Sequence, residues 1–159
     1  MKNKFIKLSI LSLFITACSI SNPLKKESKI IAKDCPQSLI LYESRAFDFD
    51  DAIVELPTGY DLSCYLIEQE GVVEISTNYS LNVRLKEKEK VKENKIYQVN
   101  LIIFVTDQSK EIKIKEFQFS KDLKIQKEEK NFFVFNFNDK IQIDTDVYNE
   151  GVKLFYALN

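Results

Sequence analysis

Residues 72–85, VVEISTNYSLNVRL, alternate between two kinds of side chain over their whole length. One set of alternate positions is mostly apolar, and the other set is entirely polar or charged. The first set is Val73, Ile75, Thr77, Tyr79, Leu81, Val83 and Leu85, and the second is Glu74, Ser76, Asn78, Ser80, Asn82 and Arg84. Because successive side chains of a β-strand point to opposite faces, this pattern predicts a long strand with one buried and one solvated face.

The same period of two recurs along the chain on both sides of this strand. Turn-forming residues separate the alternating runs, with Gly71 and Gly151 placed where a reversal needs them. We expect strands at 37–43, 51–56, 60–69, 72–85, 95–106, 111–120, 131–137, 140–144 and 151–158. Short strands joined by tight turns predict an all-β fold, a single antiparallel β-sandwich of about eight strands, immunoglobulin-like in architecture, over residues 35–159.

Two local features refine this expectation. In the segment 111–120 the apolar phase slips from even to odd positions, which predicts a β-bulge near Lys115 and Glu116. No segment shows a sustained helical period, and the charged run at residues 86–94 favours a solvated loop over a helical turn.

The N-terminus carries a targeting segment that is separate from the folded domain. Three lysines precede the apolar run LSILSLFIT at residues 8–16, which is too short to span a bilayer that needs about 20 residues. It leads into Ile15-Thr16-Ala17-Cys18, an apolar residue and two small residues before a cysteine. This arrangement resembles the lipobox of bacterial lipoproteins, in which the cysteine thiol receives a diacylglyceryl group before cleavage. The resemblance implies a signal peptide at residues 1–17 and a mature chain that starts at lipidated Cys18; a general secretory signal ending in Ala-Cys is the alternative.

The residues after Cys18 predict an anchored and spaced domain. Residues 18–34 are polar and basic, contain a proline and show no sustained period, as is typical of a flexible tether. The residue after the cysteine is Ser19 and not Asp, which by the lipoprotein sorting rule implies the periplasmic face of the outer membrane. The lipid would be the only membrane anchor and the only non-protein group, so we expect no cofactor and no metal.

Two further cysteines, Cys35 and Cys64, then remain in an oxidising compartment where free thiols are unusual. We expect a disulfide between them that joins the first strand of the domain to a central one. A redox-active thiol pair is the alternative, although the chain has no Cys-x-x-Cys motif.

The domain itself resembles small lipoproteins of alphaproteobacteria whose function is uncharacterised. The similarity lies in Cys35-Pro36 after the tether, the aliphatic residues 39–41, Cys64-Tyr65, and Phe104-Val105-Thr106-Asp107 before a turn. This resemblance implies no catalytic residues.

Composition excludes several classes of function. The chain contains no His, which removes the usual general base and the commonest metal ligand, so we expect no enzymatic activity. Its net charge is −1 before the lysine-bearing signal is removed, and a net-acidic domain is a poor binder of nucleic acid.

The acidic segment around Asp48, Asp50 and Asp51 is the first candidate contact surface. It is short of basic residues nearby in sequence and lies next to Ile53 and Leu56, which suits a recognition rim beside a small hydrophobic contact. A solvated acidic loop and a Ca²⁺ site are the alternatives. The aromatic run at residues 132–137 is interpreted as core, with a partner groove or an exposed edge as the alternative.

Two hypotheses of function follow. The first is a non-catalytic cell-envelope lipoprotein whose sandwich docks on a protein partner, in an assembly, scaffolding or stability role. The second is a ligand-binding module for glycan or peptidoglycan, for which Tyr79 beside Asn78 and Asn82 is the only sequence indication.

The lipobox interpretation predicts that Cys18 is acylated. The wild-type protein should incorporate an alkyne palmitate label and partition into the detergent phase, and Cys18→Ser should abolish both. Labelling that survives the substitution would overturn the interpretation.

Overall fold

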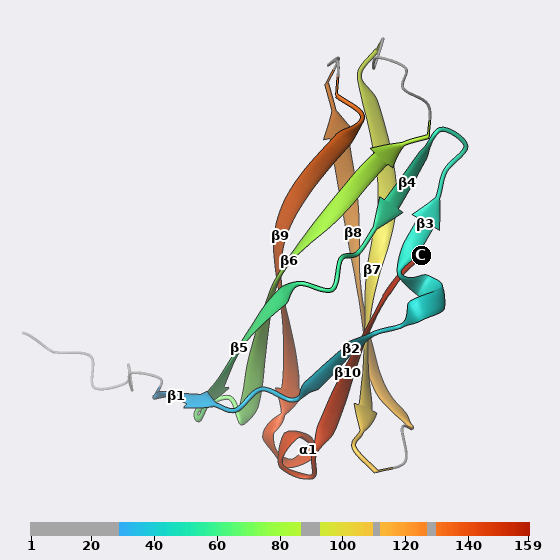
Figure 1. The fold of residues 1–159 in the computed structure, drawn as a ribbon. Coiled ribbons are helices and arrows are strands. Elements are labelled where there is room, and N and C mark those ends of the chain that lie inside the picture. Colours follow the sequence, from blue (N-terminus) through green and yellow to red (C-terminus); the bar gives the residue numbers. More distant parts are fainter. Residues whose placement is uncertain (1–28, 87–92, 110–111, 127–129) are drawn as a thin grey trace, which may run out of the picture.

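The computed structural model describes residues 29–86, 93–109, 112–126 and 130–159, which form ten strands in two packed sheets (Figure 1). The first sheet contains β1 (Ile30–Lys33), β3 (Ala46–Asp48), β4 (Ala52–Glu55), β5 (Tyr60–Ile67), β6 (Val72–Leu85) and β9 (Phe132–Asp144). The second contains β2 (Gln37–Ile40), β7 (Lys95–Asp107), β8 (Lys113–Ile125) and β10 (Val152–Leu158). A short 3₁₀ helix, η1 (Tyr42–Ser44), and a single α-helix, α1 (Thr145–Asn149), complete the described part. The expectation of an all-β sandwich is confirmed, and the immunoglobulin-like detail stays a prediction.

Strand β6 is the centre of the first sheet. Along one edge it pairs with β5 from Val72 to Tyr79 and then with β4 from Asn82 to Leu85. Along the other edge it pairs with β9 from Val72 to Arg84. Its odd-numbered side chains from 73 to 83 are buried, so the alternation read in the sequence is the alternation of burial.

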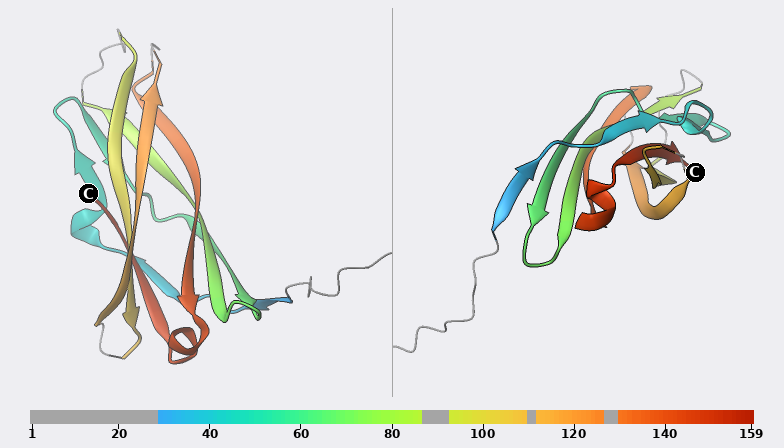
Figure 2. Two further views of the ribbon diagram at one scale, coloured as in Figure 1. Left: turned by 180° about the vertical axis from the view of Figure 1, so that it is seen from behind. Right: turned by 90° about the horizontal axis from the view of Figure 1, so that it is seen from below.

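The second sheet is built on β7, which lies between β8 and β10. Strand β2 adds to the far side of β10 and runs parallel to it. The expected sandwich was entirely antiparallel, and this pair is the exception. It arises because the chain leaves the first sheet after β1, crosses to the second for β2, and returns through η1 to β3 (Figure 2).

Several boundaries differ from the expectation. Residues Ile30–Lys33 were assigned to the tether but form β1, because their backbone pairs with β5 although their side chains are largely exposed. The chain from 132 to 144 is one strand and not two, because Asp139 faces the interior instead of forming a turn. Helix α1 was missed because five residues are too few to show a helical period.

Other local expectations hold. The bulge in β8 is present, with Ile114 left out of a register in which Val105 faces Lys115 and Thr106 faces Lys113. It lies one residue before the expected position. Gly71 has a positive φ of 65° in the turn between β5 and β6, as the hairpin requires. The signal peptide, Cys18 and residues 87–92 of the charged run lie outside the described residues.

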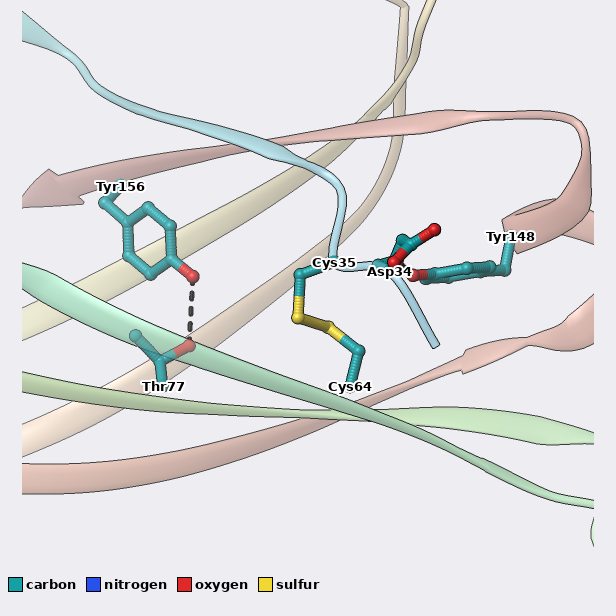
Figure 3. Close-up of a disulfide and its surroundings, with 6 residues drawn as sticks. All are labelled: Asp34, Cys35, Cys64, Thr77, Tyr148 and Tyr156. Carbon is teal, nitrogen blue, oxygen red and sulfur yellow. Dashed lines mark hydrogen bonds between the residues drawn. A yellow bond between two sulfur atoms is a disulfide. The ribbon is translucent and has the colours of Figure 1, made fainter. Parts of the chain in front are cut away.

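The expected disulfide joins Cys35 to Cys64, with the Cα atoms 5.4 Å apart (Figure 3). Cys35 lies at the crossing between the two sheets, and Cys64 is a buried residue of β5. Beside it the Tyr148 hydroxyl of α1 donates to the Asp34 backbone carbonyl. Deeper in the core the Tyr156 and Thr77 hydroxyls hydrogen-bond at 3.0 Å across the sheets, and burial raises the pKa of Tyr156 to about 12. The crossing is therefore fixed to β5 by the disulfide and to α1 by the Tyr148 hydrogen bond.

Removing this disulfide should destabilise the domain. The bond spans 29 residues of sequence, and in the chain-entropy model a loop of that size contributes about 3.5 kcal/mol. The double variant Cys35→Ser/Cys64→Ser should lose about that much in urea unfolding, and reduced wild-type protein should match it. Equal stability of the oxidised and reduced forms would contradict this role.

Candidate binding surfaces

The acidic segment forms the hairpin of β3 and β4, and its carboxylates have basic partners from other strands. The Lys86 ammonium lies 2.6 Å from the Asp48 carboxylate, and Lys95 at the start of β7 pairs with Asp51. The hydrogen bond from Lys95 is the largest cause of a lowered Asp51 pKa. The premise of an acidic surface short of counter-charges is therefore wrong, because the lysines come from parts of the chain distant in sequence.

The hydrophobic half of that candidate surface is also corrected. Leu56 is 1% exposed and belongs to the core, so it cannot contact a partner without local unfolding. Ile53 is half-buried on the outer face of β4. All three aspartates are exposed, with Asp48 and Asp51 ion-paired and Asp50 in the tight turn between β3 and β4. No group of three metal-ligating side chains occurs in the part of the chain that the structure describes, so the Ca²⁺ alternative gains no support.

The aromatic run lies in β9 and has two different faces. Phe133, Phe135 and Phe137 are half-buried and pack against the core, as the core interpretation requires. Phe132 and Val134 point to the opposite face and are 43% and 52% exposed. The run therefore serves the core with one face and presents apolar surface with the other.

Between the facing edges of β8 and β9 lies a buried ion pair that sequence reasoning missed. The Lys121 ammonium is 2.6 Å from the Asp139 carboxylate, and these side chains are only 12% and 8% exposed. Asp139 also accepts a hydrogen bond of 2.6 Å from the Tyr79 hydroxyl, and burial followed by this bond raises the pKa of Tyr79. Lys121 lies over the ring of Phe137 at 4.9 Å. The sequence held one indication of this pair. Lys121 occupies the same set of alternate positions as the buried residues Leu123 and Ile125, where an apolar side chain would be expected.

A cavity of about 400 Å³ opens where β8 ends and β9 begins. Its described wall combines aromatic and aliphatic side chains with two lysines, Lys124 and Lys130. The lining residues are Lys124, Ile125, Gln126, Lys130, Phe132, Phe133, Val134 and Phe135. This composition suits an apolar group with a negative charge close to it.

A more open hollow of about 660 Å³ lies on the outer face of β5, β6 and β9. Three asparagines, Asn78, Asn136 and Asn138, line it, and the Asn138 amide donates to Asn78 at 2.6 Å and to Ser76 at 2.9 Å. The sequence indication for a glycan site also needed an exposed Tyr79. That residue is 5% exposed and its hydroxyl donates to Asp139. The hollow therefore offers amides for a sugar but no exposed Tyr79 ring.

No known protein family, curated protein or solved structure matches this chain. Among the described residues, no helix is long and apolar enough to cross a membrane.

The Lys121–Asp139 ion pair lies at the seam between the facing edges of β8 and β9. We expect the contributions of its two charges to the free energy of unfolding to depend on one another. Asp139→Asn leaves the Lys121 charge buried without a counter-ion, and we expect a loss of about 3 kcal/mol in urea unfolding. Lys121→Met leaves the Asp139 charge with the Tyr79 hydroxyl alone and should also destabilise. The double variant Lys121→Met/Asp139→Leu should lose clearly less than the sum of the two single losses. Additive losses would mean that the two charges do not depend on one another.

Proposed function

We propose that the chain is a non-catalytic lipoprotein of the cell envelope, anchored through lipid on Cys18, whose β-sandwich docks on a protein partner. The observation that carries the docking proposal is the exposed apolar surface of β9, Phe132 and Val134, beside a lysine-lined cavity. Exposed aromatic and aliphatic groups beside a charged rim have the composition of a protein contact.

The position of this surface relative to the anchor supports a protein partner over the anchoring membrane. Strand β1 begins at Ile30, so residues 19–29 are the only spacer between Cys18 and the sheet. Fully extended, a spacer of this length reaches at most about 40 Å. Strand β1 and the start of β9 lie at opposite ends of the sandwich (Figure 1). With the β1 end held toward the membrane, the apolar part of β9 faces away from it.

The anchor itself is supported by the sequence signal at residues 8–18 and by the disulfide, which suits an oxidising compartment. Ser19 supports the periplasmic face of the outer membrane. The chain contains no His, which is consistent with a binding role.

Binding of a glycan such as peptidoglycan is the second candidate. It is favoured by the hollow that Asn78, Asn136 and Asn138 line, because amides can donate to and accept from sugar hydroxyls. Its weakness is physical: the aromatic ring that would stack on a sugar is turned into the core at Tyr79.

Site-specific photo-crosslinking in intact cells distinguishes these functions. A crosslinking amino acid is placed singly at Val134, Asn138 and Asp50 of the full chain, all exposed positions. We expect a discrete protein adduct from Val134, resolved by gel shift and identified by mass spectrometry. Muramidase-sensitive material from Asn138 alone would favour the glycan function. An adduct from Asp50 alone would move the protein contact to the β3–β4 hairpin, and no adduct from any position would overturn both functions.

A further inference from the structure

We propose that an apolar patch on the outer face of the first sheet, at the β1 end, lies on the bilayer that holds the Cys18 lipid. This inference rests on the proposed lipid anchor, and it adds a contact with phospholipid at the end opposite to the apolar surface of β9. We call these side chains the anchor-end patch; they are Ile30, Ala32, Tyr65, Ile67 and Val72.

The register of β1, β5 and β6 assembles the patch. Side chains that lie directly opposite one another in a ladder share one face of the sheet. The opposed pairs are Ile30 with Ile67, Ala32 with Tyr65, and Ile67 with Val72. The neighbouring residues Cys64 and Val73 are buried, so the core lies on the other face and the patch points outward.

The exposure of the patch marks it as a contact surface. Ile30 is 63% exposed and Tyr65 is 40% exposed, and Ile67 and Val72 beside them are half-buried. Apolar side chains that gather over neighbouring strands indicate a contact more than scattered ones do. An aliphatic side chain next to a tyrosine suits the headgroup region of a bilayer, because the tyrosine ring is apolar and its hydroxyl is polar.

Lysines compensate two of the carboxylates that border the patch. The Lys29 ammonium lies 3.3 Å from the Glu68 carboxylate, and the Lys140 ammonium lies 2.7 Å from the Glu74 carboxylate. Asp144 of β9 is a further exposed carboxylate, on the side of the patch away from β1. The patch itself is uncharged. Its contact with lipid should therefore depend on apolar burial and not on attraction to anionic headgroups.

The length of chain between the anchor and the sheet favours the bilayer as the occupant. Residues 19–29 separate Cys18 from Ile30, and fully extended they reach at most about 40 Å. Ile30 is the first residue of β1, so the patch lies where the connection to the lipid joins the sheet. A contact tethered at this short range meets the bilayer at an effective concentration on the order of millimolar. A soluble partner has no such advantage.

The size of the patch also fits a lipid surface better than a second copy of this chain. A stable protein interface contains about 20–30 residues on each side, far more than the patch provides. A membrane contact needs less, because a covalent lipid and a second, weak signal together anchor a protein stably. The patch supplies that second signal.

The test exploits the absence of Trp from the chain, which lets one introduced Trp report on one position. Tyr65→Trp places the reporter in the patch. Ile96→Trp is the matched control, at a position that is 58% exposed near the start of β7, at the opposite end of the sandwich (Figure 1). Each acylated full-length variant is reconstituted into phosphatidylcholine vesicles with brominated acyl chains, which quench Trp emission at short range.

We expect the emission of Tyr65→Trp to be quenched about twofold or more, because an aromatic ring in this position lies at the level of the headgroups. The emission of Ile96→Trp should stay unchanged. High salt should leave the quenching of Tyr65→Trp in place, since the contact is apolar.

A second substitution separates the patch from the anchor. Ile30→Glu, added to Tyr65→Trp, should remove most of the quenching although the protein still floats with the vesicles. Ile96→Glu in the same background makes the same change at a similarly exposed isoleucine and should leave the quenching intact.

Four results would overturn the inference in distinguishable ways. Flotation without quenching of Tyr65→Trp would reject the patch contact and leave the lipid anchor in place. Failure of the wild-type protein to float or to carry an acyl label would reject the anchor itself. Without vesicles, a blue shift of Tyr65→Trp emission that grows with protein concentration would make a second copy the occupant. A blue shift independent of concentration would mean that another part of this chain covers the patch.

Discussion

The two-sided pairing of β6 is the constraint on which the rest of the domain depends. One strand with a strict alternation of burial holds β9 along its whole length on one edge and shares its other edge between β5 and β4. A shift of one residue in its register would exchange Ile75 and Leu81 for Ser76 and Ser80 in the core. The positions of β9, of the outer asparagines and of the disulfide-bearing β5 all follow from this register.

The positions of the charges at strand edges and at the ends of the sandwich matter more for this domain than its net charge. At the β3–β4 hairpin, Lys86, just after β6, and Lys95 of β7 form ion pairs with Asp48 and Asp51, so two of the three aspartates have a counter-ion. At the seam between the sheets, Lys121 and Asp139 place opposite charges inside the two facing edges. The uncharged stretch at residues 132–137 lies just before Asp139 on the same strand, β9.

Much of this architecture could be predicted because it depends on patterns of apolar and polar residues that are local in sequence. The strands with clean alternation, the glycine turn at Gly71, the bulge in β8 and the Cys35–Cys64 pair all leave a signal within a few residues. Features that depend on distant partners could not be predicted in this way. Strand β1 exists because β5 offers an edge to it, and two carboxylates of the acidic hairpin are paired because Lys86 and Lys95 fold back onto it. Lys121 could be recognised as a charged residue at an otherwise apolar position of its strand. Its partner Asp139 could not, because Asn138-Asp139 resembles a turn in sequence.

The parallel pairing of β2 with β10 has a consequence for how the protein is made. Strand β10 is synthesised after every other described strand, yet it forms the inner strand that joins β2 to β7. The second sheet therefore cannot close until β10 has left the ribosome. Under the proposed export of the chain, this order is an advantage, because the topology prevents folding before the last strand is available. Such a dependence on contacts between distant parts of the chain also slows folding, which lengthens the time in which the apolar run of β9 is exposed and open to aggregation.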